Sequence, residues 1–468
     1  MIFIEKDIIR IMGKYLKKFD SHAEYNAFTA TTAFILPNVS LCVNEDDLHY
    51  NPLVRVSGVT LDKSELSLKE GDIETLVASV LPSNASNKNV VWSSSDDSIA
   101  TVDNGVVSGV GVGNATITVT TEDGGFIAQC AATVKNYKVI TYTATSKLPE
   151  TTNTGSTVGL HTSAFSGTSG QRLTMVSHTF DDGVGTVTFN GDIAKFGDYA
   201  FYSATTLASI DIPDSVTSIG NSAFQNCSGL TNCTIGSGVT SIGVSAFTYC
   251  RSLSNIVIPD SVTSLGYEAF SFCSGLTSVT IGNGVTSTGD YTFRGCSSLT
   301  SIDIPDSITT VGRGAFYSCK SLTSCTIGSG VTSIGNAAFS ACSGLTSVTI
   351  PDNVTSIGQT AFSSCSSLTS CTIGSGVTSI GYYAFGSCSS LTSCTIGSGV
   401  TSIDADAFRY CNNLVSVTVE AITPPTLGSG VFENNASGRK IYVPSESVET
   451  YKSASGWNVY ASDIQAIP

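Results

Sequence analysis

Apolar and polar residues alternate in short runs along most of the chain, and in its second half the same runs return at a fixed distance. Nine 23-residue units follow one another without insertion, beginning at Leu207, Leu230, Leu253, Leu276, Leu299, Leu322, Leu345, Leu368 and Leu391. Their consensus is LTSxTIxxxVTSIGxxAFxxCSx, and a degenerate tenth copy covers residues 184–206. One unit cannot bury its apolar side alone, so this period predicts stacked copies that share a continuous core.

Each unit predicts one rung of a ladder of parallel strands. Positions 1, 4 and 6 face one side of an extended segment, and positions 3 and 5 face the other. Gly-Ser-Gly or Gly-Asn-Gly then turns the chain in alternate units, and Pro-Asp-Ser does so in most of the others, until two consecutive Gly-Ser-Gly units, at Leu368 and Leu391, end the alternation. The phenylalanine at position 18 predicts an internal aromatic column. We therefore expect a mainly β solenoid of about ten 23-residue rungs.

These units resemble the BspA-type leucine-rich repeats, also called the Treponema pallidum type. The resemblance rests on LxxIxIPDSVTSIGxxAFxxC, which first appears at Leu207–Cys227 and then recurs over roughly half of the chain. It implies a leucine-rich repeat solenoid. Proteins of this family are mostly surface or secreted proteins of bacteria and some protozoa, implicated in adhesion to host or bacterial partners. The segment that follows the repeats resembles the family's closing cap, in which we expect Pro424-Pro425 to stop the ladder and Trp457 to fill its end.

A second pattern occupies residues 53–135, where apolar and polar residues alternate between regularly spaced turns. It predicts a small antiparallel β-sandwich with Trp92 in its core and a tight hairpin turn at Asp103–Gly105. Through VTLDKSELSLKEGD, WSSSDDSIATVD, GVVSGVGVG and NATITVT, the segment resembles the group 2 bacterial immunoglobulin-like (Ig-like) domains. Such domains usually act as spacers in surface proteins and in phage tail or capsid proteins.

The remaining segments complete the expected organisation of the chain. It comprises an attachment segment (1–52), the Ig-like domain (53–135), a linker and N-terminal cap (136–183), the solenoid (184–413) and a C-terminal cap (414–468). The first segment carries a plausible capping box at Ser21–Glu24 and resembles N-terminal modules of phage structural proteins from gut Bacteroidetes. Charged residues interrupt its apolar start, so we expect no secretory signal, and translation can begin at Met1 or Met12.

Composition excludes some classes of function. The charged fraction is 13%, about half the usual share, and Ser, Thr and Gly take its place, which favours β-rich structure. A net charge of −15 argues against a nucleic-acid partner, because a phosphate-binding surface needs clustered Lys and Arg. No apolar run approaches the roughly 20 residues of a membrane-spanning helix.

The chain contains 15 cysteines, which raises the question of a metal or redox site. Nine occupy position 21 of the units: Cys227, Cys250, Cys273, Cys296, Cys319, Cys342, Cys365, Cys388 and Cys411. Four more, Cys233, Cys325, Cys371 and Cys394, occupy position 4, where sister units carry Ile or Val. A position that accepts Cys, Ile or Val is typical of a small buried hydrophobic residue. Cysteines in a straight column do not converge on one point, as the ligands of a metal ion must. The spacing of the rungs is also larger than the Cβ–Cβ distance that a disulfide prefers. We expect buried free thiols, with scattered disulfides as the alternative, and no metal or other cofactor.

Two further sets of residues are candidates for chemistry. Asp214, Asp260, Asp306 and Asp352 recur about two rungs, or roughly 10 Å, apart, which is too far for one calcium ion, so we expect them to cap turns. The histidines, His22, His49, His161 and His178, lie outside the repeats without a catalytic spacing. We interpret them as surface or local structural residues and find no convergent set of acid, base and nucleophile.

The candidate ligand-binding surface is the outward face of the strands at positions 3 and 5. Its named residues are Ser209, Asp211, Asn232, Thr234, Asn255, Ser278, Ser301, Asp303, Ser324 and Thr326. This face suits many weak hydrogen bonds to a glycan or an extended protein, although an unoccupied soluble sheet face has the same pattern. Aromatic residues on the opposite wall can also engage sugars; they are Tyr249, Tyr267, Phe272, Tyr291, Tyr382 and Tyr383.

These observations favour a non-enzymatic extracellular or cell-surface protein that adheres to a surface protein or glycan of a host or bacterium. The alternative is a structural or host-attachment protein of a phage tail or capsid, displayed on the virion surface, which the missing signal and the N-terminal module favour. A hydrolase lacks its catalytic set. An intracellular scaffold fits the free thiols but not the Ig-like domain. The oligomeric state stays open.

Overall fold

The computed structural model describes residues 53–135, 138–151, 160–167 and 170–468, and the chain divides into two compact units between Asn136 and Tyr137. The expected attachment segment, with its capping box, its two histidines and Cys42, lies outside the described residues.

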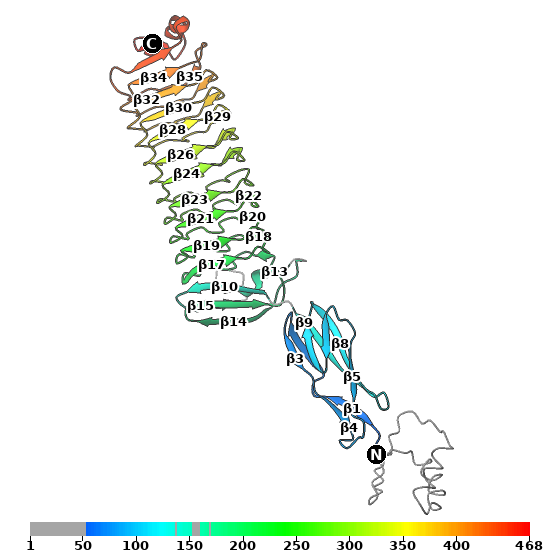
Figure 1. Ribbon diagram of the computed structural model, residues 1–468. Helices are drawn as coiled ribbons and strands as arrows, with labels where there is room; N and C mark the ends of the chain where they lie inside the picture. The colour runs from blue at the N-terminus through cyan, green and yellow to red at the C-terminus, as the bar shows by residue number, and fades with distance from the viewer. Residues whose placement is uncertain (1–52, 136–137, 152–159, 168–169) are drawn as a thin grey trace, which may run out of the picture. The chain divides into compact units, whose positions relative to one another are not determined.

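The first unit is a β-sandwich (Figure 1). Its strands are β1 (Gly58–Leu61), β2 (Glu65–Lys69), β3 (Ile73–Thr75), β4 (Ala78–Leu81), β5 (Val90–Ser94), β6 (Ala100–Asp103), β7 (Val106–Gly109), β8 (Gly113–Thr121) and β9 (Ile127–Lys135). They form sheets in the orders β2-β9-β8-β5, β3-β7-β6 and β1-β4. The pairing of β2 with β9 is parallel and the others are antiparallel, so the expected antiparallel sandwich has one parallel edge.

Alternation along these strands builds the sandwich core. In β8, Ala115, Ile117 and Val119 point inward and are buried, because every second side chain of a strand faces the same side. Trp92 is only half-buried and packs against this core from its margin, which is shallower than expected. The predicted hairpin turn is confirmed between β6 and β7, where Asn104 and Gly105 adopt φ values of 48° and 84°.

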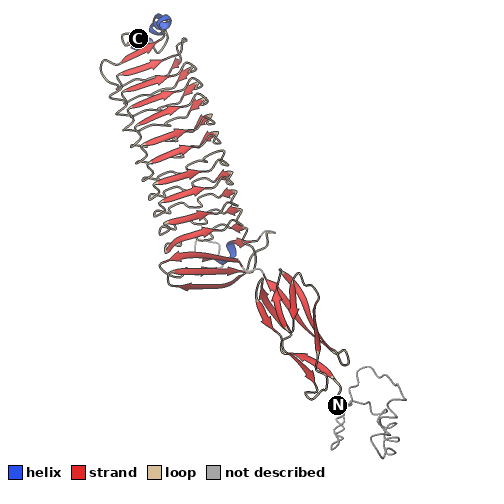
Figure 2. Cartoon of the chain, viewed as in Figure 1, coloured by secondary structure: helices blue, strands red, loops and turns tan. Residues whose placement is uncertain are grey.

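The second unit begins with an antiparallel cap and continues as a solenoid. Its opening elements are β10 (Lys138–Ala144), β11 (Glu150–Thr151), β12 (Leu160–His161), the 3-10 helix η1 (Thr162–Ala164), β13 (Phe165–Ser166), β14 (Met175–Asp181), β15 (Val184–Phe189) and β16 (Lys195–Phe196). Strands and turns dominate both units, and helix is confined to short segments (Figure 2).

Each repeat unit contributes a long strand and, in most units, a short strand on another side of the solenoid (Figure 1). The long strands are β17 (Leu207–Ile212), β19 (Asn232–Ile235), β21 (Asn255–Ile258), β23 (Ser278–Ile281), β24 (Ser301–Ile304), β26 (Ser324–Ile327), β28 (Ser347–Ile350), β30 (Ser370–Ile373), β32 (Ser393–Ile396) and β34 (Ser416–Val419). The short strands are β18 (Ser218–Ile219), β20 (Ser241–Ile242), β22 (Ser264–Leu265), β25 (Thr310–Val311), β27 (Ser333–Ile334), β29 (Ser356–Ile357), β31 (Ser379–Ile380) and β33 (Ser402–Ile403). Paired long strands run parallel with a register of one unit, as predicted.

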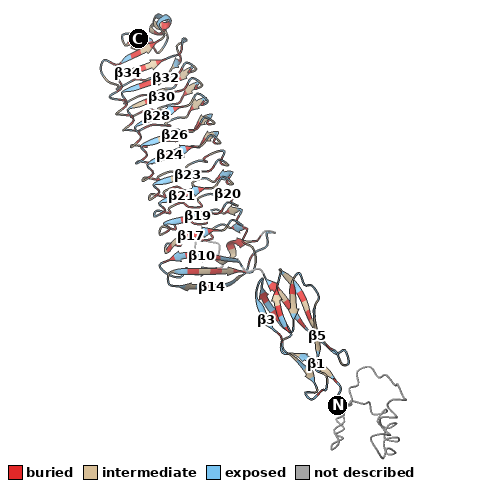
Figure 3. Ribbon diagram, viewed as in Figure 1, coloured by how far each residue is buried: buried red, intermediate tan, exposed pale blue. Residues whose placement is uncertain are grey.

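The predicted aromatic column is confirmed in the solenoid core. From Phe201 to Phe408 the position-18 rings are fully buried and stack with centroids 4.9–5.5 Å apart and planes within 11°. Leucine at position 1 and alanine at position 17 pack beside them. Buried and exposed residues alternate along the strands (Figure 3), and the buried ones belong to the same core cluster as this column.

Two ladders of hydroxyl groups run along the solenoid surface. At position 2, Thr323 donates to the carbonyl of Thr300, and Thr346 donates to Thr323 in the next rung. A second ladder at position 11 repeats the contact, as where Thr355 donates to Thr332. Because each hydroxyl satisfies a backbone carbonyl of the preceding rung, these threonines couple neighbouring units in addition to the strand pairing.

The first rung departs from the predicted parallel ladder. Residues 184–206 were expected to add a parallel strand before β17, but β10 lies between β15 and β17 and pairs antiparallel with both. Only the short strand β16 joins its successor β18 in parallel. This arrangement covers the ladder edge with a twisted antiparallel sheet, which keeps unpaired backbone groups from solvent.

The opposite end also differs from prediction, because the ladder does not stop at Pro424-Pro425. It continues through β35 (Thr426–Leu427), β36 (Lys440–Val443) and β37 (Ile464–Ala466), with η2 (Ser445–Ser447), α3 (Val448–Ser453) and η3 (Asn458–Tyr460) between the last two strands. The ladder tolerates the prolines because they precede β35, whose Thr426 supplies the N–H that bonds to Thr401. Trp457 is fully buried against Phe432, as expected, and its indole N–H donates to the Pro425 carbonyl at 2.7 Å.

Candidate functional site

The predicted ligand-binding residues lie on one face of the long strands, which we call the strand face. Asp211, Asn232, Thr234, Asn255, Ser278, Ser301, Asp303, Ser324 and Thr326 are exposed. Paired strands bring equivalent positions side by side, as Ser301 beside Ser324 and Asp303 beside Thr326. Alternation within each strand sends these side chains outward while positions 4 and 6 face the core.

Ser209 is the exception on the strand face. It is half-buried because β10 lies beside β17, and its hydroxyl is 2.7 Å from that of Thr143. The antiparallel cap therefore occupies the first position of the predicted surface. The residues from Asp211 onward keep their hydroxyl, amide and carboxylate groups accessible. The strand face can therefore offer repeated hydrogen-bond donors and acceptors at the spacing of the rungs.

Four of the predicted aromatic residues lie close together on the turns behind the long strands. Tyr249 and Phe272 stack with ring centroids 5.0 Å apart, and Tyr267 meets Tyr291 edge to face at 5.7 Å. Tyr382 and Tyr383 form a separate pair, 6.0 Å apart, several rungs away. The opposite wall thus carries two aromatic groups rather than a continuous stripe.

The cysteines of position 21 form a buried column, and each thiol has a hydrogen-bond role that the sequence analysis missed. The thiol of Cys227 donates to the carbonyl of Phe201 in the preceding unit at 2.9 Å, and the other eight repeat this contact at 3.1–3.3 Å. Burial raises the pKa of Cys227 and of Cys319 to about 12. All nine units carry cysteine here, whereas position 4 exchanges it with Ile and Val, and that contrast was the available signal.

The cysteines of position 4 behave as interchangeable core residues. Cys233, Cys371 and Cys394 are buried, whereas Cys325 is half-buried. Cys371 and Cys394 are register partners in β30 and β32, with sulfur atoms 2.9 Å apart. All cysteines within the described residues are free thiols.

The recurring aspartates cap turns, as predicted, but each caps the turn of the following unit rather than its own. Asp306 accepts from the backbone N–H of Ser329, which lies 23 residues later. A side chain at Gly330 would not fit beneath this turn, because an added Cβ would lie 1.8 Å from the Asp306 carbonyl oxygen. A Gly-Ser-Gly or Gly-Asn-Gly turn thus stacks on each of these Pro-Asp turns, and at Leu391 a Gly-Ser-Gly turn stacks equally closely on another Gly-Ser-Gly turn.

Like His161, His178 is buried, which corrects the interpretation of both as surface residues and leaves the structural one. Its Nε2 lies 2.7 Å from the Tyr142 hydroxyl, and its Nδ1 lies 2.8 Å from a carboxylate oxygen of Glu150. The ionised Glu150 carboxylate can only accept, so Nδ1–H donates to it, and burial lowers the pKa of His178 and favours the neutral ring, whose Nε2 then accepts from the Tyr142 hydroxyl. The same hydroxyl accepts the N–H of Leu148 at 3.2 Å. These hydrogen bonds link β10, β14 and β11, with Tyr142 and His178 buried, so the group holds the N-terminal cap together.

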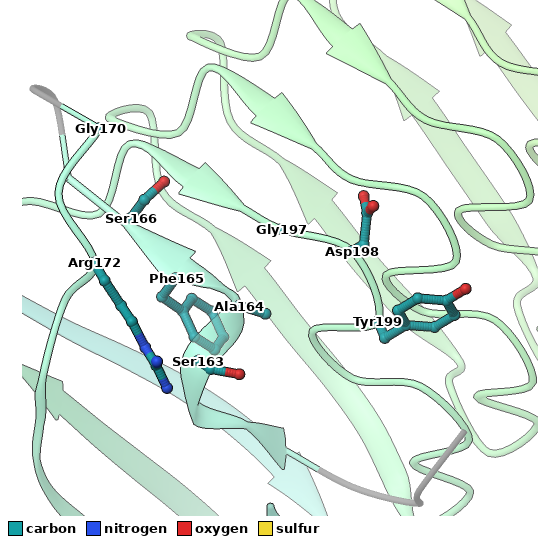
Figure 4. A pocket seen from close by; sticks show the side chains of 9 residues that line it. All are labelled: Ser163, Ala164, Phe165, Ser166, Gly170, Arg172, Gly197, Asp198 and Tyr199. Carbon is teal, nitrogen blue, oxygen red and sulfur yellow. The ribbon is translucent and has the colours of Figure 1, made fainter. Parts of the chain in front are cut away.

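A hollow of about 390 Å³ lies beside η1 and β13 (Figure 4). Arg172 lines one side, Asp198 and Tyr199 line another, and Phe165 lies between them (Figure 4). The Asp198 carboxylate already accepts the backbone N–H of Asn221 at 2.7 Å. The lining contains no His or Cys, and its charged side chains are Arg172 and Asp198.

Within the described ranges, no group of three or more His, Cys, Asp or Glu side chains is placed to hold a metal ion. Among the same residues, none of the helices combines the length and apolarity that crossing a bilayer requires.

Comparison with known families identifies both units. The model of the BspA type leucine rich repeat region matches residues 194–323, 267–391 and 309–439, which together cover more than half of the chain. The model of the bacterial Ig-like domain (group 2) matches residues 55–132. The Ig-like match agrees with the sandwich of the first unit.

Individual proteins resemble shorter parts of the chain. An alpha-L-arabinofuranosidase from Bifidobacterium longum is 47% identical over 90 residues, which is 19% of this chain and 8% of that enzyme. The Ig-like virion protein of Serratia phage KSP90 is 40% identical over 84 residues, or 18% of this chain and 33% of the virion protein. The chain thus spans a third or less of the length of these curated relatives. A leucine-rich repeat protein of Bacteroides ovatus is 22% identical, with 62% of this chain and 90% of that protein covered and a TM-score of 0.36.

Proposed function

The chain belongs to the BspA-type leucine-rich repeat proteins, and we propose that it is a non-enzymatic binding protein that presents its strand face to a ligand. The ligand is a surface protein or a glycan of a host or bacterium. Proteins with this repeat are typically found at the cell surface or secreted, which supports display outside the cell. The Ig-like domain serves as a spacer in this proposal.

The observation that carries the proposal is the accessible row of polar groups on the strand face. Hydroxyl, amide and carboxylate groups recur from Asp211 to Thr326 on strands fixed by parallel pairing and by the stacked core. Individually weak hydrogen bonds add up on such a surface, because the rigid solenoid loses little conformational entropy when a ligand binds. Few charged groups interrupt the row, which suits a ligand rich in hydroxyl or amide groups.

Binding to intact cells and to a glycan array tests this function with the full chain. Ser278→Arg combined with Ser301→Arg places two long cations on the neighbouring strands β23 and β24 and should reduce binding at least tenfold. Gln359→Arg adds the same side chain at an exposed turn position outside the strand face and should bind as the wild type does. Equal binding by all three proteins, or no binding by the wild type to any cell or glycan, would contradict the proposal.

A second candidate is a virion protein that attaches a phage to its host, and the similarity to the Ig-like virion protein favours it. The strand face would then contact the host surface from a tail or capsid. Immunogold labelling with antibodies against the solenoid separates the two candidates. Label on purified virions supports the phage protein, whereas label on bacterial cells without virions supports the cell-surface protein.

A further inference from the structure

A shallow depression, which we call the lateral hollow, lies on the turns that precede β21, β23, β24 and β26. Figure 1 labels these four strands, which follow one another along the solenoid. Its lining comes from positions 20 and 22 of four successive units: Tyr249 and Arg251, Phe272 and Ser274, Gly295 and Ser297, and Ser318 and Lys320. Its volume is about 440 Å³, a size common for small-ligand sites. None of the residues that line it is acidic.

Stacked aromatic rings form part of the floor of the lateral hollow. The rings of Tyr249 and Phe272 lie 5.0 Å apart with planes within 9° of parallel. Both residues adopt left-handed φ values, 64° and 57°, which are unfavourable for bulky side chains, and several sister units carry Ser at this position. Gly295 leaves room for the second ring, because an added Cβ would lie 2.6 Å from Phe272 Cδ1. The left-handed backbone recurs at this position throughout the repeat, so the local departure is the pair of aromatic side chains, which builds a flat apolar surface.

Basic residues gather around the same rungs. The repeats at 207–413 contain only five, which are Arg251, Arg294, Arg313, Lys320 and Arg409, so four of the five lie within residues 251–320. The Arg294 side chain already has partners within the protein, because it forms an ion pair with Glu268 at 3.7 Å and lies over the Phe272 ring. Arg251, Arg313 and Lys320 are exposed, and no carboxylate among the described residues forms an ion pair with them.

Two of these cations bound the lateral hollow. At position 22, where most units carry Ser, Arg251 and Lys320 are separated by three rungs, or about 14 Å. The guanidinium of Arg251 lies 5.4 Å from the ring centroid of Tyr249, so it is held beside the aromatic floor. A net charge of −15 makes this positive patch an exception on the molecule.

We propose that the lateral hollow binds an acidic saccharide. One sugar ring stacks on the floor formed by Tyr249 and Phe272, and carboxylate or sulfate groups of the saccharide contact Arg251 and Lys320. The hydroxyls of Ser274, Ser297 and Ser318 are available to the sugar hydroxyls between them. This inference rests on the proposed function, because it specifies a ligand class and adds a contact surface outside the strand face.

The combination of groups favours a saccharide over other polyanions. The C–H face of a sugar ring can cover a flat aromatic surface while its hydroxyls meet neighbouring serines. An acidic peptide would satisfy the cations but has no matching rigid face for the stacked floor. A nucleic acid would encounter the repulsion of the strongly negative chain beyond the few cations of the patch.

Calorimetric titration of the full chain tests the inference with defined probes. The probes are oligogalacturonate and a chondroitin sulfate oligosaccharide as acidic sugars, malto-oligosaccharide as a neutral sugar, and poly-glutamate as an acidic peptide. The wild type should bind at least one acidic sugar, with an affinity that falls as salt is added, and should bind the other two probes at least tenfold more weakly. Arg251→Ser with Lys320→Ser, and separately Tyr249→Ser with Phe272→Ser, should each weaken this binding tenfold or more.

These variants restore the serine that sister units carry, so their fold should persist, which circular dichroism verifies. Tyr410→Ser is the matched control, because it makes the same change at position 20 of a unit outside the lateral hollow, and its binding should equal the wild type. The inference is overturned if no acidic sugar binds, if the hollow variants bind as the wild type does, or if malto-oligosaccharide or poly-glutamate binds equally well. Cell binding that depends on the strand face can persist in each of these cases, so the two proposals can fail separately.

Discussion

The carboxylate of Asp214 accepts two hydrogen bonds from Ser237 of the following unit. Its Oδ1 lies 2.7 Å from the backbone nitrogen and 2.9 Å from the hydroxyl oxygen. These bonds stabilise the ionised carboxylate and hold the pKa of Asp214 below its usual value. Asp352 makes the same pair of bonds with Ser375, and its pKa is lowered for the same reason.

Removal of this carboxylate should loosen the turn of the following unit. Asp214→Ala leaves the Ser237 N–H without its acceptor, so we expect at least tenfold faster hydrogen exchange of that amide at pH 7, measured by NMR or mass spectrometry. Asp303→Ala, on the strand face, is the control and should leave this amide unchanged. Because the folded pKa lies below 3.8, the wild-type contact should persist above that pH and disappear as the pH falls through the lowered value. Unchanged exchange in Asp214→Ala would contradict the capping role.

Loss of one ring from the aromatic column should destabilise the solenoid strongly. Phe316 is fully buried between Phe293 and Phe339, at ring distances of 5.5 and 5.1 Å. Phe316→Ala should lower the free energy of unfolding by about 3–5 kcal/mol, because it removes buried apolar surface and leaves a cavity. Urea denaturation of the full chain measures the change. Tyr410→Ser, at a ring that is 43% exposed, should change this free energy by less than about 0.5 kcal/mol, and a similar loss in both variants would argue against a specific core role.

The buried thiols should make the solenoid sensitive to alkali. Burial raises the pKa of Cys227 and Cys319 from 9.0 to about 12, so the folded state keeps these protons after the unfolded state begins to lose them. Their stabilising contribution is complete below pH 9 and is lost between pH 9 and 12, by about 1.4 kcal/mol per thiol and pH unit. Urea denaturation at pH 8 and pH 10 measures this loss. In Cys227→Ala the free energy of unfolding should fall less between these two pH values than it does in the wild type. An equal fall in the variant and the wild type would contradict the contribution of the Cys227 thiol.

Thiol titration tests the redox state on which this prediction depends. Denatured, unreduced protein should react with a thiol reagent at all 15 cysteines, whereas the native protein should react slowly because its thiols are mostly buried. If the denatured protein shows two fewer free thiols, the first disulfide to test is Cys371–Cys394, because these two sulfur atoms lie close together.

Acid should weaken the N-terminal cap of the solenoid through His178. Burial lowers the pKa of this histidine below 6.5, although Glu150 opposes the shift, so the unfolded state takes up a proton first as the pH falls. Stability should therefore be lost from pH 6.5 down to the lowered folded value, by up to about 1.4 kcal/mol per pH unit. Hydrogen exchange of β14 between pH 7.5 and 5.5 measures the opening of this cap. His178→Gln should show a smaller pH response, and an undiminished response would assign the effect to another group.

The 23-residue period was sufficient to predict the solenoid, its core and the strand face. Each unit repeats the same alternation, so the outward direction of Ser324 and Thr326 follows from the pleat of one strand. The ends of the ladder could not be predicted in this way, because their partners are not repeats. The insertion of β10 beside β17, which covers Ser209, depends on pairing between segments far apart in the sequence.

The details that the sequence analysis missed lie at variable positions of the turns. Arg251 and Lys320 are separated by three units in the sequence, and only stacking places both on one depression. The left-handed backbone at Tyr249 and Phe272 could not be predicted from the sequence either. Sister units place serine in the same conformation, so no residue type marks it. These residues are found by comparing the units position by position once the rungs are aligned in space.

Each Pro-Asp-Ser turn pairs with the Gly-Ser-Gly or Gly-Asn-Gly turn of the following unit. The solenoid can therefore lengthen or shorten most simply by a 46-residue double unit. Such a double unit carries its own aspartate cap, so a gene duplication or deletion of that size would join rungs whose contacts already match. Each such duplication or deletion would change the length of the solenoid by about 10 Å and would leave the packing of the core unchanged. The lateral hollow occupies only four units, so the number of the other units can change without altering the residues that line it.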